Sequence, residues 1–274
     1  MIKMNMLSNT FSHQITSTWH KVSDKVKWSF NSYENDISVY CDMQGIQRAY
    51  NDRNDGKIKI LWLLESKSFD QGAYEFILKN LNILDLFVEV WTHNDTLIPL
   101  SEKFKWIPAF ATVIDKCEIP KKTKNISMIS SNKTWCEGHR KRYEFALKNI
   151  RNYDLFGKGL NEIKKKEDGL LEYRFSVAIE NNVYDTYFTE KILDCFATKT
   201  IPVYIGTKKV SNFFNEDGII FIDYDFNEWD MLTEELYNSK LLSVEDNFNR
   251  VWKEYNLWED WIYDNNLQKF IKNL

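Results

Sequence analysis

The sequence is poor in the residues that mark disordered, fibrous and disulfide-stapled chains. Of 274 residues only 9 are glycine and 4 are proline, whereas aromatic residues make up 15%. This composition excludes a collagen-like or largely disordered chain, because such chains are rich in glycine or proline and poor in aromatic side chains. The few cysteines have no C-x-x-C spacing, so we expect reduced thiols and no zinc site. They are Cys41, Cys117, Cys136 and Cys195.

A surplus of positive charge is also missing. Lysine and arginine number 36 against 40 aspartate and glutamate residues, which gives a net charge of -4. Proteins that bind the phosphate backbone of nucleic acids need a cationic surplus to displace counterions. We therefore expect no nucleic-acid partner, although a few local cations can still hold one small anion.

Long apolar runs are absent as well. No stretch approaches the roughly 20 apolar residues of a membrane-spanning helix, and residues 1–14 lack the continuous apolar core of a signal peptide. We therefore expect a cytoplasmic protein with at most a loose association with a membrane surface. Asp223 and Asp225 form a D-x-D pair of the kind that binds metal, but no histidine accompanies them, so we interpret them as a loop and expect no metal cofactor.

What the chain does contain is a high apolar fraction, 43%, in a length suited to two domains. Apolar runs of strand length alternate with helix-period segments, which is typical of an α/β fold with a mostly parallel sheet. In the first half, residues 57–64 predict a buried strand and residues 74–84 a helix, with short strands at 87–91 and 104–109. Residues 1–122 are thus predicted to form a Rossmann-like lobe.

The lysine-rich residues 118–125 are the predicted linker to a second lobe of the same kind, over residues 123–246. Residues 247–274 complete the chain with a helix whose aromatic stripe we expect to pack back on the body. The elements predicted for the second lobe are strands at 126–130, 153–156, 174–179, 201–205 and 219–222 and helices at 140–149 and 190–198.

A charged segment interrupts the apolar runs of the second lobe. Between the strand at 174–179 and the helix at 190–198, Thr189 is a good helix N-cap and Glu190 suits the helix dipole. Lys191 opposes the dipole, and its position makes physical sense if an anion binds there to the lysine and the free backbone N–H groups. The pattern favours a phosphate-bearing ligand over an ordinary helix start.

Three ordered motifs in this segment resemble those of the α1,3-fucosyltransferases. They are E-N at 180–181, Y-F-T-E-K at 187–191 and I-P-V-Y-I-G at 201–206, and the step of nine residues from Asn181 to Glu190 is also similar to that of the family.

Four further elements of the family have counterparts upstream: S-N at 131–132, R-K-R-Y at 140–143, F-G-K-G at 156–159 and Y-R-F at 173–175. In the first half, the resemblance is limited to L-E-S at 64–66 and T-H at 92–93. The resemblance is therefore carried mainly by residues 128–222.

The resemblance implies a GT-B glycosyltransferase of two Rossmann-like lobes. Members of this family transfer fucose from GDP-fucose to a glycan acceptor with inversion, and they need no bound metal. Arg140 and Lys191 would then bind the diphosphate, Glu190 the ribose hydroxyls, and Glu180 would orient the loop. The residues that the resemblance assigns to the nucleotide sugar are Arg140, Tyr173, Glu180, Asn181, Tyr187, Thr189, Glu190 and Lys191.

Inverting transfer also needs a base that takes the proton of the acceptor hydroxyl. Glu65 directly follows the strand at 57–64 and is the predicted base, with Glu75 and Glu89 as alternatives. The sequence leaves two other interpretations open. One keeps the fold with another GDP- or UDP-linked sugar, and the other is a sugar-binding or scaffold module without catalytic activity.

Overall fold

The computed structural model describes residues 1–8 and 21–271, so residues 9–14 of the N-terminal stretch discussed above lie outside the described residues. The chain divides into two compact units. Unit 1 comprises residues 1–109 and 257–274, and unit 2 comprises residues 110–256.

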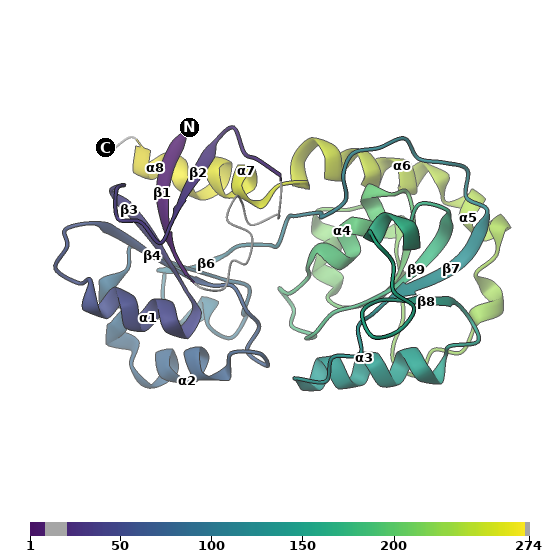
Figure 1. The fold of residues 1–274 in the computed structure, drawn as a ribbon, viewed down its shortest axis with the longest axis horizontal. Coiled ribbons are helices and arrows are strands. Elements are labelled where there is room, and N and C mark those ends of the chain that lie inside the picture. Colours follow the sequence, from purple (N-terminus) through teal and green to yellow (C-terminus); the bar gives the residue numbers. More distant parts are fainter. Residues whose placement is uncertain (9–20, 272–274) are drawn as a thin grey trace. The chain divides into compact units, whose positions relative to one another are not determined.

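Unit 1 is a six-stranded sheet with the strand order β2-β1-β3-β4-β5-β6, in which every neighbouring pair is parallel. Figure 1 shows α1 and α2 along one side of this sheet and α7 and α8 along the other. Its elements are β1 (Ile2–Leu7), β2 (Val26–Phe30), β3 (Ile37–Cys41), α1 (Asp42–Asn51), β4 (Ile58–Leu63), α2 (Gln71–Lys79), β5 (Glu89–Thr92), β6 (Phe104–Trp106), α7 (Trp258–Ile262) and α8 (Gln268–Ile271).

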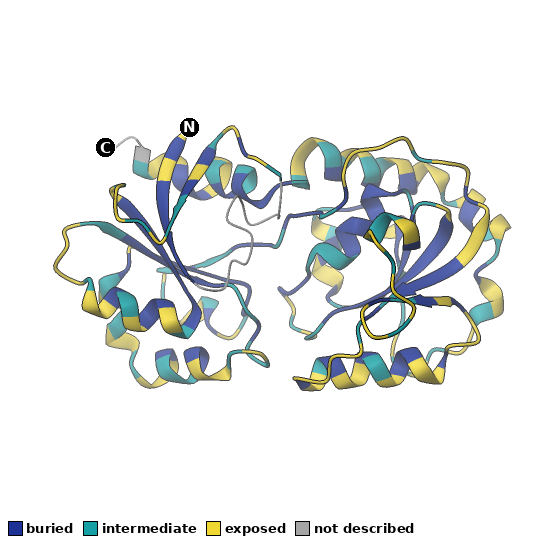
Figure 2. Cartoon of the chain, in the orientation of Figure 1, coloured by how far each residue is buried: buried dark blue, intermediate teal, exposed yellow. Residues whose placement is uncertain are grey.

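Alternation along β4 explains why helices cover both sides of this sheet. Leu61 and Leu63 belong to the buried cluster that α1 and α2 complete, whereas Trp62 points the other way and packs edge-on against Trp258 of α7, with ring centroids 4.7 Å apart. A parallel strand covered on both faces favours apolar side chains on both sides, which is why residues 60–63 of this strand form a continuous apolar run. Figure 2 shows the central strands of both units as almost entirely buried.

Unit 2 is a five-stranded sheet with the order β11-β10-β9-β7-β8, again with parallel pairs throughout. In Figure 1, α3 lies along one side of the sheet and α4 and α6 along the other. Its elements are β7 (Lys124–Ile129), α3 (Glu137–Lys148), β8 (Asp154–Phe156), β9 (Tyr173–Ile179), α4 (Glu190–Ala197), β10 (Ile201–Ile205), β11 (Ile220–Phe221), α5 (Glu234–Ser239) and α6 (Leu241–Arg250).

The boundary between the units differs from the predicted linker at 118–125. Lys122, which made that segment look solvated, is buried in unit 2, where its Nζ donates to the carbonyls of Thr198 (2.7 Å) and Leu170 (3.2 Å) and to Oγ1 of Thr200 (2.9 Å). Burial lowers the pKa of Lys122 to about 7. A buried lysine with three acceptors belongs to the body of a domain, and the division lies between residues 109 and 110.

The C-terminal tail is shared between the two units. Residues up to Asn256 belong to unit 2 and residues from Leu257 onward to unit 1, whereas the sequence predicted a single segment from residue 247. In unit 1, Glu259 of the tail accepts a hydrogen bond from Trp28 Nε1 (2.9 Å), and Lys269 pairs with the buried carboxylate of Glu89. The tail thus supplies hydrogen-bonding and charged partners for buried side chains of the first unit.

No helix among residues 1–8 and 21–271 has both the length and the apolar character needed to cross a membrane.

Candidate functional site

A pocket of about 320 Å³ lies at the carboxyl edge of the unit 2 sheet. Its wall is formed by residues 129–131 at the end of β7, residues 157–158 after β8, the second half of β9 and the first turns of α4. In an open parallel sheet this edge is where ligands bind, because loops and helix N-termini converge there. The location agrees with the expectation that the charged segment after β9 belongs to a binding site.

Close backbone packing shapes the turn after β8. Gly157 has a φ of +134°, and a Cβ on this residue would lie 1.7 Å from the carbonyl oxygen of Ser130. No side chain fits there, so glycine is required at position 157 for the loop after β8 to approach the loop after β7. This approach brings Lys158 to the pocket wall.

Glu180, at the end of β9, holds the start of α4 in place. Its Oε1 accepts hydrogen bonds from the backbone N–H of Thr189 (2.8 Å) and from the Tyr204 hydroxyl (3.2 Å). Its Oε2 accepts from Oγ1 of Thr189 (2.7 Å) and pairs with Nζ of Lys191 (3.3 Å). The side chain is fully buried and does not line the pocket, so its role is to orient the helix start and Lys191.

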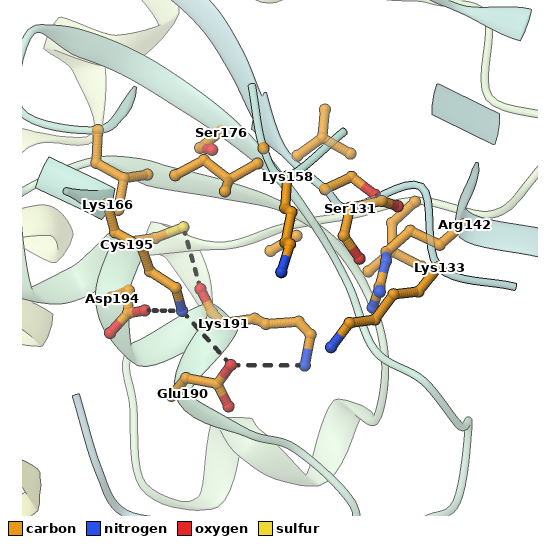
Figure 3. Close-up of a pocket in the computed structure, with 17 residues that line it drawn as sticks. Ser131, Lys133, Arg142, Lys158, Lys166, Ser176, Glu190, Lys191, Asp194 and Cys195 are labelled. Atoms are coloured by element: carbon orange, nitrogen blue, oxygen red, sulfur yellow. Dashed lines mark hydrogen bonds and ion pairs between the residues drawn. The ribbon is translucent and has the colours of Figure 1, made fainter. Parts of the chain in front are cut away.

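Cationic side chains dominate the pocket wall, with five of them against the two carboxylates of Glu190 and Asp194. Figure 3 shows Lys133, Arg142, Lys158 and Lys191 pointing into the same space. Within the described part of the chain, ion pairs at the pocket involve only Lys166 and Lys191. The cations are Lys133, Arg142, Lys158, Lys166 and Lys191.

Lys166 neutralises the acidic side of the pocket. Its Nζ lies 2.8 Å from Oδ2 of Asp194 and 3.5 Å from Oε1 of Glu190 (Figure 3). Burial favours the neutral form of Glu190, but the charges of Lys191 and Lys166 outweigh it and hold the pKa of this carboxyl well below its usual range. Asp194 also accepts hydrogen bonds from Oγ1 of Thr112 (2.7 Å) and the N–H of Val113 (3.0 Å).

Helix α3 supplies the opposite wall through one face of its surface. His139, Arg142 and Phe145 follow each other at three-residue spacing and are buried, whereas Arg140 lies on the exposed face. A guanidinium nitrogen of Arg142 donates to Oδ1 of Asn181. The contact is possible because Gly138 has no Cβ, which would lie 1.8 Å from the carbonyl oxygen of Asn181.

The pKa of His139 reflects the positive field of this wall. Burial lowers the pKa of the imidazole to about 4, and the charges of Arg142, Lys133 and Lys191 act in the same direction. The histidine is therefore neutral at physiological pH, and its Nδ1 has no hydrogen-bond partner among the described residues.

The residues predicted to bind the nucleotide sugar fall into three groups. Glu190 and Lys191 line the pocket, and Glu180, Asn181 and Thr189 contact residues that do. Arg140, Tyr173 and Tyr187 are not part of the pocket wall.

Two of the residues outside the wall have other contacts. The Arg140 guanidinium donates to the carbonyl of Thr134, at 3.5 Å. Tyr173 begins β9, at the end of the strand away from the pocket, and its hydroxyl donates to Oδ2 of Asp154 (2.7 Å). Neither contact brings the side chain toward the pocket.

Four cations of the pocket were missed by the sequence prediction: Lys133, Arg142, Lys158 and Lys166. The sequence does carry a signal for Lys158, because this residue lies inside the F-G-K-G element at 156–159. Lys166 belongs to a K-K-K-E-D run at 164–168, a pattern typical of a solvated surface, and the fold places it beside Asp194.

The predicted base, Glu65, lies in unit 1. It follows β4 directly, at the carboxyl edge of that sheet, and is partly exposed. The two alternatives are placed differently. Glu89 opens β5 at the amino end of the strand and is buried, and Glu75 lies on α2 beside Lys79 (3.7 Å).

Asp223 and Asp225 lie in the turn after β11, where Oδ1 of Asp223 accepts from the N–H of Asp225 (2.9 Å). Among the residues that the structure describes, no group of three or more histidine, cysteine, aspartate or glutamate side chains is arranged to hold a metal ion.

Residues 119–272 match the model of the family described as glycosyltransferase family 10 (fucosyltransferase), C-terminal part. Among curated proteins, the α-(1,3)-fucosyltransferase FucT of Helicobacter pylori is 35% identical over 68 residues, 25% of this chain and 14% of that protein. The mouse 4-galactosyl-N-acetylglucosaminide 3-α-L-fucosyltransferase 9 is 28% identical over 148 residues, 52% of this chain and 38% of that protein. The chain thus spans well under half the length of these curated relatives.

Solved structures of an α1,3-fucosyltransferase share the fold. One of them superposes with a TM-score of 0.56 at 12% identity and covers 98% of this chain and 89% of its own. The same comparison with a structure that contains GDP gives a TM-score of 0.55 at 13% identity, with the same coverage. The likeness confirms the predicted α/β architecture of two Rossmann-like units of the GT-B class.

Proposed function

The chain belongs to glycosyltransferase family 10, and from this membership we propose that it transfers fucose from GDP-fucose to a hydroxyl of a glycan acceptor, with inversion at the anomeric carbon. The observation that carries the proposal is the cationic pocket of unit 2, which lies at the carboxyl edge of a Rossmann-like sheet and is bounded by the start of α4. A diphosphate is the part of a nucleotide sugar that such a pocket suits, because it offers several charged acceptor oxygens.

In the transfer step, the cations of the pocket would stabilise the leaving diphosphate. The acceptor oxygen forms a bond to the anomeric carbon while the bond from that carbon to the diphosphate oxygen breaks, and GDP leaves with an additional negative charge. Lys191 and Arg142 reach the pocket from opposite walls and would stabilise that charge as it develops. Lys158 extends the same surface from the turn after β8.

In this proposal, one carboxylate at the pocket binds the donor and the other has a structural role. Glu190 is kept ionised by Lys191 and Lys166, so it accepts hydrogen bonds from the ribose hydroxyls, as expected from the sequence. Asp194 fixes Lys166 and the segment at Thr112 and does not react.

Glu65 is the proposed base, which takes the proton of the acceptor hydroxyl as the new bond forms. Support comes from its position at the carboxyl edge of the unit 1 sheet and from its partial exposure. The alternative Glu89 is less suited, because its carboxylate is buried at the amino end of β5 against Trp91 and Lys269. Catalysis without a bound metal and a cytoplasmic location remain parts of the proposal that rest on the sequence.

A donor screen tests the function directly. The protein is incubated with GDP-fucose, GDP-mannose, UDP-galactose and UDP-N-acetylglucosamine, and the release of GDP or UDP is followed. Hydrolysis confined to GDP-fucose supports the proposal. Hydrolysis of another donor moves the chain to a different sugar on the same fold, and binding of glycans without turnover of any donor identifies a silent sugar-binding module.

A further inference from the structure

The loop that carries Glu65 is held by side chains to which neither the sequence analysis nor the proposed mechanism assigns a role. We infer that Asp42 and Tyr74 are positioning residues for Glu65, which fix its main chain so that its carboxylate can accept the proton of the acceptor. This inference rests on the proposed function, in which Glu65 is the base.

Asp42 holds the amino side of Glu65. It is the first residue of α1, directly after β3, and its Oδ1 accepts hydrogen bonds from the N–H groups of Leu64 (2.9 Å) and Glu65 (3.1 Å). Its exposed fraction is only 6%. Two main-chain donors thus converge on one buried oxygen, which ties the end of β4 to the neighbouring β3–α1 junction.

The backbone of Asp42 indicates that the geometry is specific. Its φ of 53° lies in the left-handed region, which non-glycine residues rarely adopt and in which aspartate and asparagine are the best tolerated. This conformation turns the side chain of the first residue of α1 toward the next loop of the sheet.

Tyr74 holds the carboxyl side of Glu65. Its hydroxyl donates to the carbonyl oxygen of Glu65 at 2.7 Å, and its ring is buried in the core that α2 shares with the sheet. Both peptide groups that flank Glu65 therefore have a partner in the packed body of unit 1. These two bonds restrict the main chain at Glu65, and a small displacement of a catalytic group is costly.

Asp70 completes a reciprocal link between the same two loops. Its Oδ1 accepts from the N–H of Ala73 (3.3 Å) and caps α2, and its Oδ2 accepts from the N–H of Met43 at the start of α1 (3.1 Å). Asp42 thus reaches from α1 to the Glu65 loop, and Asp70 reaches from that loop back to α1. The two β–α connections are fixed to each other on both sides of Glu65.

The two N–H groups of Leu64 and Glu65 require an oxygen acceptor at position 42, and they do not require a full negative charge there. Burial, offset in part by the hydrogen bonds from Glu65 and Leu64, raises the pKa of Asp42 to about 7. Asparagine offers the same oxygen and tolerates the same backbone conformation, whereas glycine tolerates the conformation and offers no oxygen. The pair Asp42→Asn and Asp42→Gly therefore separates loss of the acceptor from backbone strain.

Steady-state hydrolysis of GDP-fucose tests the inference, with release of GDP as the signal. Asp42→Gly is expected to lower kcat by about 10- to 100-fold with little change in KM, because the donor pocket is untouched while the base is displaced. Asp42→Asn is expected to keep a kcat close to that of the wild type. Asp52→Asn is the control, the same kind of change at the other end of α1, where the Asp52 carboxylate accepts from the hydroxyls of Tyr33 (2.8 Å) and Tyr40 (3.1 Å), and its kcat should equal that of the wild type.

Either of two results in the Asp42 variants would overturn the inference: a wild-type kcat in Asp42→Gly, or a kcat in Asp42→Asn as low as that of Asp42→Gly. If Asp42→Gly does not fold by circular dichroism, Tyr74→Phe decides, because it removes one hydroxyl from the core, and an unchanged kcat in that variant contradicts the inference. Glu65→Gln separates this test from the proposed function. A fully active Glu65→Gln refutes the base assignment and the inference with it, whereas an inactive Glu65→Gln beside a fully active Asp42→Gly refutes the inference alone.

Discussion

Replacement of Lys191 by alanine should weaken the binding of GDP without unfolding unit 2. In Lys191→Ala the pocket loses a cation that lies 3.3 Å from Glu180 and 2.9 Å from Oγ1 of Thr189, and that Figure 3 shows pointing into the pocket. Glu180 keeps its hydrogen bonds from Thr189 and Tyr204, so the substitution leaves no buried carboxylate without a partner. The stability of unit 2 should therefore change little.

The expected loss of affinity follows from one charge-assisted hydrogen bond to the diphosphate. Such a bond contributes about 1.5–3 kcal/mol, which corresponds to an increase in Kd of roughly 10- to 150-fold. Isothermal titration calorimetry with GDP measures the change directly. Part of the loss should disappear at high salt, because screening weakens the interaction of the partly exposed cation in the wild type as well.

Lys209→Ala is the matched control, since it removes one positive charge from the same unit. Lys209 forms a surface pair with Asp185 at 3.8 Å and does not line the pocket. Its replacement should leave the Kd for GDP nearly unchanged. An equal loss of affinity in both variants would show that only the net charge matters, and a normal Kd in Lys191→Ala would refute the assignment of the diphosphate to this pocket.

Four further outcomes test other parts of the account. Arg142→Ala should raise the Kd for GDP by at least about tenfold, whereas Arg140→Ala should leave it nearly unchanged. The reverse result would favour Arg140, the arginine predicted from the sequence, over Arg142, which lines the pocket. The free energy of unfolding should rise as the pH increases from about 7 toward 10.5, because in this range Lys122 binds a proton in the unfolded chain but not in the native state. Urea titrations should show this rise in the wild type and not in Lys122→Met. Trp258→Ala should destabilise unit 1 by about 3–5 kcal/mol in the same assay, since it empties a buried contact with Trp62. Treatment with EDTA should leave GDP-fucose hydrolysis unchanged, and a loss that Mg²⁺ or Mn²⁺ restores would contradict catalysis without metal.

The strands that build the site could be predicted because burial on both faces leaves a strong signal in the sequence. Every residue of β9 and β10 is buried, and the predicted bounds of both strands agree with the structure to within one residue. Apart from Arg174 and Ser176 in β9, the residues of both strands are apolar. The strands near the N-terminus could not be found this way. In β1 the buried Asn5 interrupts the apolar pattern. Its amide nitrogen donates to the carbonyl of Asn35 and the hydroxyl of Ser38, which lie 30 and 33 residues further along the chain.

The composition of the pocket was harder to predict because it depends on helix phase and on contacts distant in sequence. The helix that carries the arginines begins at Glu137, whereas the sequence predicted a start at Arg140. Its buried face therefore includes Arg142, which shares that face with His139. Lys166 reaches Asp194 across 28 residues, a contact that no local pattern encodes.

The central claim is that the cationic pocket holds the diphosphate of GDP-fucose for transfer to a glycan. Its most direct test is incubation of the protein with GDP-fucose and a mixed set of oligosaccharide acceptors, followed by quantification of GDP and analysis of the product linkage by NMR. The account predicts one fucosylated product per GDP released, with the configuration at the anomeric carbon inverted relative to the donor, and loss of this product in Lys191→Ala at limiting donor. A product with retained configuration, or sugar transfer from UDP-linked donors in place of GDP-fucose, would contradict it.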